Sequence, residues 1–209
     1  MIYLINYGNK PYAKMQKFQS YTARRFGKVD RVIEYSDIDI QADTEFYSNN
    51  KKILSVKKGN GYWLWKPYII YKTLQRLKDD DVLIYSDVDT IFLDSVSPLI
   101  EIMNKHKKDM LVFDSPNKEY QYTKYNLCED LGLTDKSIIT SRQRYASYNL
   151  WRKTDTSLSF AKHWLHHCGN EVFISDDNTS YTPGYIEHYV EHKHDQSIFS
   201  LLTKKNKIE

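Results

Sequence analysis

Apolar residues in this chain come either in short unbroken runs or at helical spacing, and polar segments separate the two patterns. Short apolar runs bounded by charge are typical of buried strands, whereas apolar residues three and four apart are typical of helices. Five strands are therefore predicted, at residues 2–5, 29–35, 82–85, 110–113 and 145–152. Helices are predicted at residues 12–25, from Pro67, from Ser97, from Thr154 or Asp155, and at 195–202.

Four of the predicted helices have residues at helical spacing on one face that we expect to pack on a core. These faces are formed by Ala13, Phe18, Tyr21 and Arg25, by Ile70, Leu74 and Leu77, by Leu99, Ile102 and Met103, and by Leu158, Ala161, Leu165 and Cys168. The remaining segments are more polar: one short helix is predicted at 43–47 within 37–58, a flexible break at 59–61, and loops over 115–140 and 169–185.

Strands that alternate with helices predict an α/β fold with a mixed, mostly parallel central sheet flanked by helices. No composition shift marks a linker, so residues 1–209 are expected to form a single domain. The chain stops soon after its last predicted helix, and the sequence leaves open whether it is the N-terminal part of a longer protein.

The strongest candidate chemistry is the strand from Val82 that leads through Ser86 into Asp87-Val88-Asp89. Ligands in open α/β sheets gather beyond the carboxyl ends of strands. Side chains two residues apart lie on the same side of an extended strand end, so both carboxylates are expected to face one point. Such a pair suits Mg²⁺ or Mn²⁺, which can hold a diphosphate, although Asp-x-Asp also occurs simply as a turn or cap.

Composition limits the alternatives. The hydrophobic fraction is 41%, the charged fraction is 27% and the net charge is +3, which is typical of a globular protein and too weak to indicate nucleic acid. The two cysteines, Cys128 and Cys168, are too few and too far apart to suggest zinc, and they indicate a reducing, cytoplasmic setting. No apolar run is long enough to span a membrane.

Four sequence blocks occur in an order that resembles the small GT-A glycosyltransferases. This family includes bacterial capsule-type sugar transferases and enzymes that glycosylate chlorovirus capsid protein, to whose N-terminal domains the chain looks most similar. The blocks are Asn6-Tyr7-Gly8, Gly61-Tyr62-Trp63-Leu64-Trp65-Lys66-Pro67, Asp87-Val88-Asp89 and His194-Asp195-Gln196-Ser197.

The resemblance implies a GT-A (Rossmann-like) fold, a UDP-sugar donor, and a glycan or glycoprotein acceptor. It also implies that Mn²⁺, or Mg²⁺, joins Asp87 and Asp89 to the diphosphate. The base and ribose are expected near the loop after the first strand, and the full set of expected donor contacts is Asn6, Tyr7, Gly8, Lys66, Ser86, Asp87, Asp89 and His194. A third metal ligand stays open: His192 or His194 can serve, or the ion has two protein ligands.

Asp195 and Gln196 are the expected catalytic residues. The resemblance places them at the donor sugar, with Gln196 near the anomeric carbon, and favours retention of configuration; Asp195 as a helix N-cap is the alternative. Lys66 is either a phosphate contact or a solvated lysine. Further candidates are Arg142 and Arg144, spaced to share a face and clamp phosphate, and Asp114, which follows a strand and can contact the acceptor.

Two other functions share some of these features. A nucleotidyltransferase has a similar sheet and metal site, but it normally opens with a Gly-rich basic loop that residues 6–10 do not match. A non-catalytic glycan-binding module would use metal and aromatic residues without a nucleotide. Binding of UDP distinguishes the glycosyltransferase from this module.

Overall fold

The computed structural model describes residues 1–177 and 188–208, and its contacts divide the chain into two compact units. Unit 1 comprises Met1–Asn49, Tyr68–Leu111 and Ser147–Ala161, and unit 2 comprises Asn50–Pro67, Val112–Ala146 and Lys162–Glu209. The single domain expected for residues 1–209 stays a prediction. No helix among the described residues is long and apolar enough to cross a membrane.

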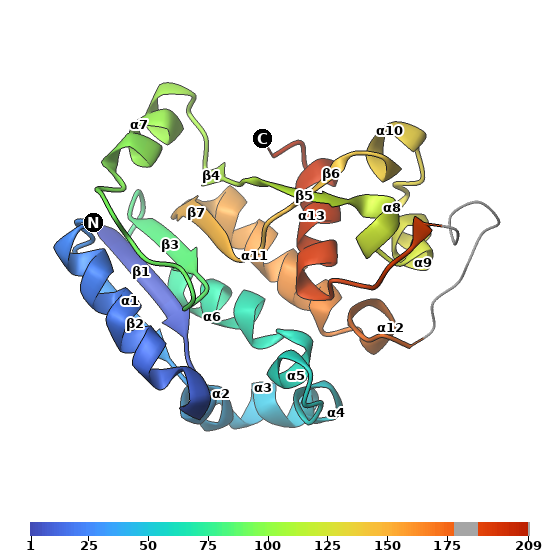
Figure 1. The fold of residues 1–209 in the computed structure, drawn as a ribbon, viewed down its shortest axis with the longest axis horizontal. Coiled ribbons are helices and arrows are strands. Elements are labelled where there is room, and N and C mark those ends of the chain that lie inside the picture. Colours follow the sequence, from blue (N-terminus) through green and yellow to red (C-terminus); the bar gives the residue numbers. More distant parts are fainter. Residues whose placement is uncertain (178–187, 209) are drawn as a thin grey trace. The chain divides into compact units, whose positions relative to one another are not determined.

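Unit 1 is built on a five-stranded sheet in the order β2-β1-β3-β7-β4 (Figure 1). The strands are β1 (Ile2–Tyr7), β2 (Arg31–Tyr35), β3 (Val82–Ser86), β4 (Met110–Leu111) and β7 (Tyr148–Arg152). Strand β1 pairs in parallel with β2 and β3, whereas β7 is antiparallel to β3 and β4. The mixed α/β fold is thus confirmed, with the parallel pairing confined to β2, β1 and β3.

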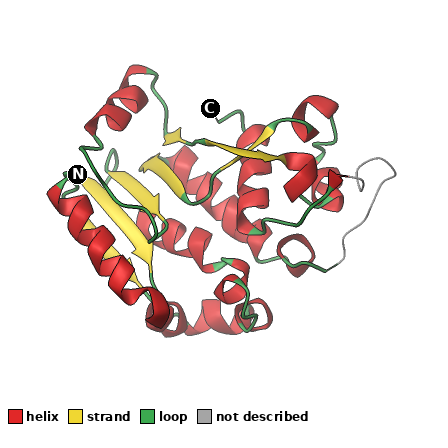
Figure 2. Ribbon diagram, viewed as in Figure 1, coloured by secondary structure: helices red, strands yellow, loops and turns green. Residues whose placement is uncertain are grey.

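Helices accompany this sheet along the chain (Figure 2). They are the 3₁₀ turn η1 (Lys10–Tyr12), α1 (Ala13–Arg25), α2 (Asp37–Ala42), α3 (Thr44–Asn49), α6 (Trp65–Leu74), α7 (Ser97–Lys105) and α11 (Asp155–Cys168). Pro67 lies in the first turn of α6, as predicted, and the Thr154 hydroxyl caps α11 by accepting from the Ser157 amide at 3.2 Å. On α7, Met103 is fully buried but Ile102 is exposed, so that part of the predicted inward face is wrong.

Helix α1 turns the opposite face inward from the one its sequence suggests. Phe18 and Tyr21 are exposed, at 56% and 57%. The side chains that α1 buries are mostly polar, namely Gln16, Gln19, Ser20, Thr22 and Ala23. The prediction for this helix is wrong because the ends of β1 and β3 present buried polar atoms, and these need hydrogen-bonding partners more than they need apolar cover.

Unit 2 contains a two-stranded antiparallel sheet, β5 (Asp114–Lys118) and β6 (Arg142–Arg144), together with short helices. The helices are α4 (Lys51–Leu54), α5 (Gly59–Tyr62), α8 (Glu119–Tyr122), α9 (Tyr125–Leu131), α10 (Lys136–Ile139), α12 (Glu171–Ile174) and α13 (Asp195–Lys205). The core includes Trp164 and Phe199, whose rings lie 4.6 Å apart.

Several segment predictions need correction. Residues 37–58 hold three helices instead of one, and 115–140 contains β5, α8, α9 and α10 instead of loops. The strand expected over 145–152 begins only at Tyr148. These short elements carry too few periodic apolar positions to be recognised from the sequence. Pro183 and Gly184 of the predicted polar loop lie outside the described residues.

Candidate functional site

The Asp-x-Asp segment follows the middle strand of the unit 1 sheet. Strand β3 ends at Ser86, and the Asp87 carbonyl then accepts from the Thr90 amide at 3.1 Å, which closes a turn. The expectation that Asp87 and Asp89 continue an extended strand is therefore wrong. Asp87 is half-buried and Asp89 is exposed, so the turn presents both residues at the carboxyl edge of the sheet.

Hydrogen bonds from three residues hold this turn in place. The Asp87 amide donates to the Ser147 carbonyl at 2.8 Å, and the Tyr85 hydroxyl donates to the Asp87 carboxylate. From α1, the Gln19 side chain donates to the Ser86 hydroxyl at 3.1 Å and to the Asp87 carbonyl. Sequence reasoning missed Gln19, because a glutamine inside a helix gives no signal that its partner lies 68 residues away.

Asp87 and Asp89 fit a hard divalent cation by their chemistry. Both offer carboxylate oxygens from one short turn, and Mg²⁺ and Mn²⁺ take such ligands while sharing their shell with water and phosphate. Among residues 1–177 and 188–208, no group of three or more His, Cys, Asp or Glu side chains is placed to hold a metal. The pair would therefore supply two ligands, and the third protein ligand considered from the sequence stays a prediction.

The end of β1 lies beside this turn, because β1 and β3 are parallel and pair Ile5 with Tyr85. Asn6 and Tyr7 belong to the strand itself, which corrects their assignment to its exit loop. The Asn6 side chain is fully buried, donates to Gln19 at 2.8 Å and accepts from Gln16 at 3.0 Å. In the structure it therefore joins β1 to the buried polar face of α1.

Tyr7 and Gly8 follow at the same edge of the sheet. Tyr7 is nearly buried, and its hydroxyl donates to the carboxylate of Asp37 at the start of α2. The Gly8 amide donates to the Tyr35 carbonyl at 3.0 Å. A Cβ at Gly8 would stand 2.8 Å from the Gln16 side-chain oxygen, so the close approach of α1 requires glycine here.

In unit 2, the helix α13 opens with a buried ion pair. Asp195 is the first residue of α13, and its carboxylate lies 3.2 Å from the Lys66 ammonium. Each residue is only 3% exposed. The N-cap position belongs to His194, so the alternative reading of Asp195 as the N-cap is wrong, and Lys66 is not a solvated lysine. A pair of this kind is retained only when each charge compensates the other.

His194 has one ring nitrogen engaged and one available. Its Nδ1 donates to the Ile174 carbonyl at 2.7 Å, because a carbonyl can only accept. Its Nε2 has no hydrogen-bond partner among the described residues and lies 3.6 Å from the Asp176 carboxylate. Burial lowers the pKa of His194 to about 4, so the ring is neutral at pH 7 and Nε2 carries a lone pair.

His192 differs from His194 because the backbone uses both of its nitrogens. Its Nε2 lies 2.8 Å from the Phe173 carbonyl, and its Nδ1 accepts from the Lys124 amide at 3.4 Å. Burial, with added repulsion from His194 and Lys124, holds the pKa of His192 well below its usual range. Of the two histidines considered as metal ligands, only His194 has a ring nitrogen that forms no hydrogen bond with the described residues.

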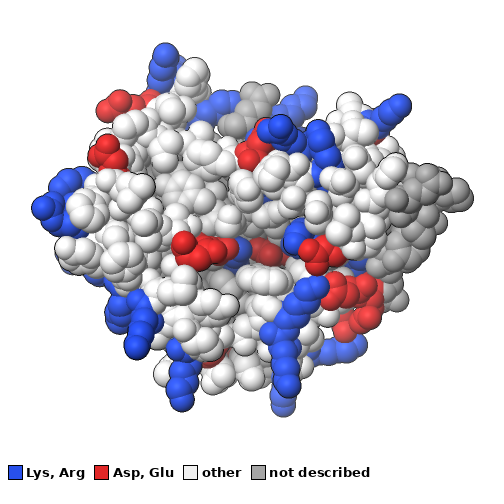
Figure 3. All heavy atoms as spheres, viewed as in Figure 1, with Lys and Arg blue, Asp and Glu red and all other residues white. Residues whose placement is uncertain are grey.

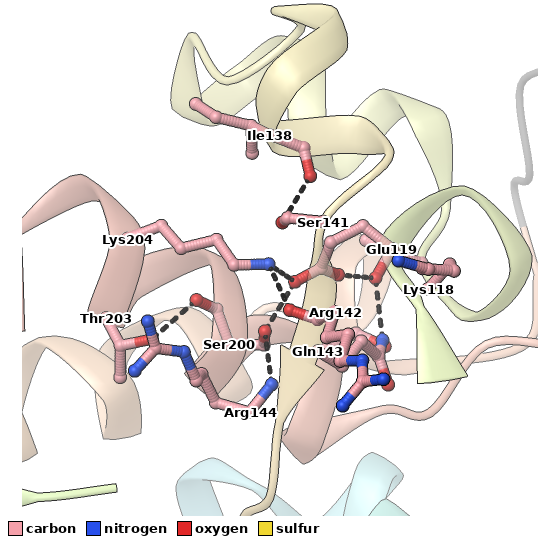
Figure 4. A network of polar contacts seen from close by, with 12 residues as sticks. Lys118, Glu119, Ile138, Ser141, Arg142, Gln143, Arg144, Ser200, Thr203 and Lys204 are labelled. Atoms are coloured by element: carbon pink, nitrogen blue, oxygen red, sulfur yellow. Dashed lines mark hydrogen bonds and ion pairs between the residues drawn. The ribbon is translucent and has the colours of Figure 1, made fainter. Parts of the chain in front are cut away.

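Gln196 ends a chain of buried hydrogen bonds. Its side-chain nitrogen donates to the Gln143 oxygen at 3.0 Å, and the Gln143 nitrogen donates to the Thr123 hydroxyl at 2.9 Å. Thr123 in turn donates to Glu119 at 2.5 Å. Glu119 is fully buried and also accepts from Ser200 and Lys204 (Figure 4). The sequence did not indicate a role for Gln143 or Glu119, because both fall in or next to residues 115–140, which were predicted to be loops.

The remaining candidates lie on the β5–β6 sheet. Asp114 is paired in register with Arg144, and their side chains form an ion pair at 3.0 Å. Arg142 is exposed and Arg144 is partly exposed, whereas Gln143 between them is buried, so the two arginines share the outer face. The phosphate clamp expected of them, and the acceptor contact expected of Asp114, stay predictions.

No protein-family model and no curated protein sequence matches the chain. Among solved structures, mouse xyloside xylosyltransferase 1 is similar with 12% identity and a TM-score of 0.52, over 99% of this chain and 83% of that one. The bifunctional glycosyltransferase WbbM is similar with 9% identity and a TM-score of 0.50, over 96% of this chain and 37% of that one. The galactosyltransferase LgtC follows with 14% identity over 96% and 70%, and its TM-score of 0.43 is too low to support an inference. The likenesses to xyloside xylosyltransferase 1 and WbbM show a GT-A-like fold, and they do not by themselves show an activity.

Proposed function

We propose that the protein is a metal-dependent glycosyltransferase that moves a hexose or deoxyhexose from a UDP-sugar to a hydroxyl of a glycan. The observation that carries the proposal is the turn with Asp87 and Asp89 at the carboxyl end of the middle strand, in a sheet whose fold is similar to that of glycosyltransferases. Carboxylates at the carboxyl ends of the parallel strands β1 and β3 are positioned as nucleotide ligands require.

In unit 1, Asp87 and Asp89 would hold a Mn²⁺ or Mg²⁺ ion, which would supply positive charge to neutralise the departing nucleoside diphosphate. Tyr7 offers its ring to the uracil, and Gly8 lets α1 pack closely against the end of β1 beside the donor. Asn6 and Ser86 are fully buried, so they act on the donor by fixing the ends of β1 and β3 through Gln19.

In unit 2, Asp195 binds hydroxyls of the donor sugar while Lys66 balances its charge. Gln196 would lie near the anomeric carbon, and the Nε2 of His194 would accept a hydrogen bond from the donor. We propose that configuration is retained. An inverting enzyme needs a carboxylate free to act as the general base, and the carboxylate of Asp195 is already engaged by an ammonium group.

Calorimetric titration with UDP, in the presence and absence of Mn²⁺, tests this proposal. We expect a Kd on the order of micromolar that needs Mn²⁺ and is lost in Asp89→Ala. Asp79→Ala is the matched control, because it removes another exposed carboxylate of unit 1 that is outside the turn. Absence of UDP binding, or binding that ignores both the metal and Asp89, would favour a glycan-binding module instead.

The donor sugar and the acceptor form the finer part of the proposal. We propose a glycan of a viral capsid glycoprotein, made in the host cytoplasm, as the acceptor; this rests on the sequence resemblance alone. UDP-glucose and UDP-rhamnose are the first donors to compare in a hydrolysis assay, followed by transfer to short glycans. Transfer to a free bacterial glycan but to no capsid glycan would contradict the viral role and leave the transferase activity intact.

A further inference from the structure

Helix α1 carries an outward face that the catalytic proposal does not use. Lys14, Phe18, Tyr21 and Arg25 follow each other at steps of four, three and four residues, so they line one side of the helix. The opposite side packs against β1 and β2 and is mostly polar. The two large aromatic side chains of α1 are therefore both exposed, which reverses the usual distribution between a buried and a solvated face.

The charged residues of the segment that carries this face all have one sign. The segment from Asn9 to Val29 contains Lys and Arg but neither Asp nor Glu; its basic residues are Lys10, Lys14, Lys17, Arg24, Arg25 and Lys28. Lys17 forms an ion pair with Glu34 of β2. Tyr12, Met15 and Phe26 are also exposed and extend the apolar part. Figure 3 shows Lys and Arg side chains along the edge of the molecule where Figure 1 draws α1.

We propose that α1 docks the protein on an anionic membrane surface, with the helix lying in the plane of the interface. Aromatic rings settle at the boundary between headgroups and acyl chains, and basic side chains reach the lipid phosphates. A second copy of the chain is disfavoured, because two such faces would oppose like charges. A nucleic acid would meet the basic groups but leave Met15 and Phe18 in water.

Vesicle flotation with the full chain tests this surface. Neutral phosphatidylcholine vesicles are compared with vesicles that also contain about 30% phosphatidylglycerol, at low and high salt. We expect at least about tenfold tighter binding to the anionic vesicles, weakened by salt. Phe18→Ser with Tyr21→Ser, and separately Lys14→Glu with Arg25→Glu, should each reduce that affinity by about tenfold or more.

Two matched pairs of substitutions serve as controls within unit 1. Ile38→Ser with Leu93→Ser removes apolar side chains that are even more exposed than Phe18 and Tyr21, and Lys105→Glu with Lys107→Glu reverses two other exposed charges. Both should bind vesicles like the wild type. All variants alter exposed side chains, so unchanged thermal melting and unchanged UDP titration separate this proposal from folding and from the catalytic proposal.

Three results would overturn the membrane proposal. The first is equal or absent binding to both kinds of vesicle, and the second is full binding by both α1 variants. The third is weak vesicle binding by the wild type together with tight binding of single-stranded RNA, or with self-association in sedimentation, either of which the α1 variants abolish.

Discussion

The side-chain nitrogen of Gln196 donates to the side-chain oxygen of Gln143 at 3.0 Å. This contact sets which end of the Gln196 amide points inward, because Gln143 is itself held by Thr123 and by the Tyr122 carbonyl. Gln143 is fully buried and Gln196 is partly exposed. We infer that Gln143 is a positioning residue for Gln196, the residue proposed to lie at the anomeric carbon.

Replacing Gln143 should therefore slow the reaction more than it weakens donor binding. In Gln143→Leu we expect kcat to fall roughly tenfold to a hundredfold, because a displaced reacting group costs rate steeply, with KM for the donor nearly unchanged. Gln143→Glu keeps an oxygen acceptor for Gln196 and should recover part of the loss. Steady-state transfer kinetics measure this, and a variant with a lower Tm but normal kcat would show a purely structural role.

The Lys66–Asp195 pair leads to a prediction about stability. Both charges are buried, so removing one leaves the other uncompensated, and Lys66→Met or Asp195→Leu should each cost about 3–5 kcal/mol. The double variant Lys66→Met with Asp195→Leu should recover most of that loss, because no charge stays buried alone. Urea unfolding measures all three variants. Costs that simply add in the double variant would mean that the two residues do not compensate each other.

Features of the structure could be predicted from the sequence when the interacting residues are close together along the chain. The strand before Asp87 was predictable, because a buried strand is an unbroken apolar run that is visible locally. The inward face of α1 was not predictable, because buried Gln19 forms hydrogen bonds with the Asn6 side chain and the Asp87 carbonyl, which belong to other elements.

Glu119 shows the same limit in unit 2. A glutamate between polar residues predicts exposure, yet its partner Lys204 lies 85 residues further along the chain and makes burial possible. The turn at Asp87 was expected to be extended for a similar reason, because the Asp87 amide donates to the carbonyl of Ser147, which comes from a distant part of the chain. Local patterns predicted the strands, and long-range polar contacts determined the details of the site.

The close approach of α1 to the end of β1 predicts a specific cost at Gly8. A methyl group there would meet the Gln16 side chain, which cannot move freely because it donates to the Asn6 side chain and to the Tyr35 carbonyl. Gly8→Ala should destabilise the protein by about 1–3 kcal/mol, as overpacking does. In the Gln16→Ala background the same change should cost less, because only the Cβ of residue 16 stays close, at 3.0 Å. An equal cost in both backgrounds, measured by urea unfolding, would contradict the contact.

The two buried histidines of unit 2 predict acid sensitivity. Both stay neutral in the folded state: burial lowers the pKa of His194 to about 4 and holds that of His192 well below its usual range. In the unfolded chain both take up a proton near pH 6.5, so the unfolded state binds more protons below that pH. Stability should thus be full above about pH 6.5 and fall as the pH drops toward 4, by roughly 3 kcal/mol from His194 alone.

A pair of histidine substitutions tests the origin of this slope. His192→Gln should lower stability at pH 7.5, because the contacts with Phe173 and Lys124 are disturbed, but it should also flatten the fall between pH 6.5 and 4. His106→Gln, which changes an exposed histidine, should keep the slope of the wild type. Urea unfolding across this pH range measures both effects. The Nδ1 of His192 must be unprotonated to accept from the Lys124 amide, so replacing this histidine should remove its share of the pH dependence of stability. A slope that persists unchanged in His192→Gln would mean that the proton uptake belongs to other groups.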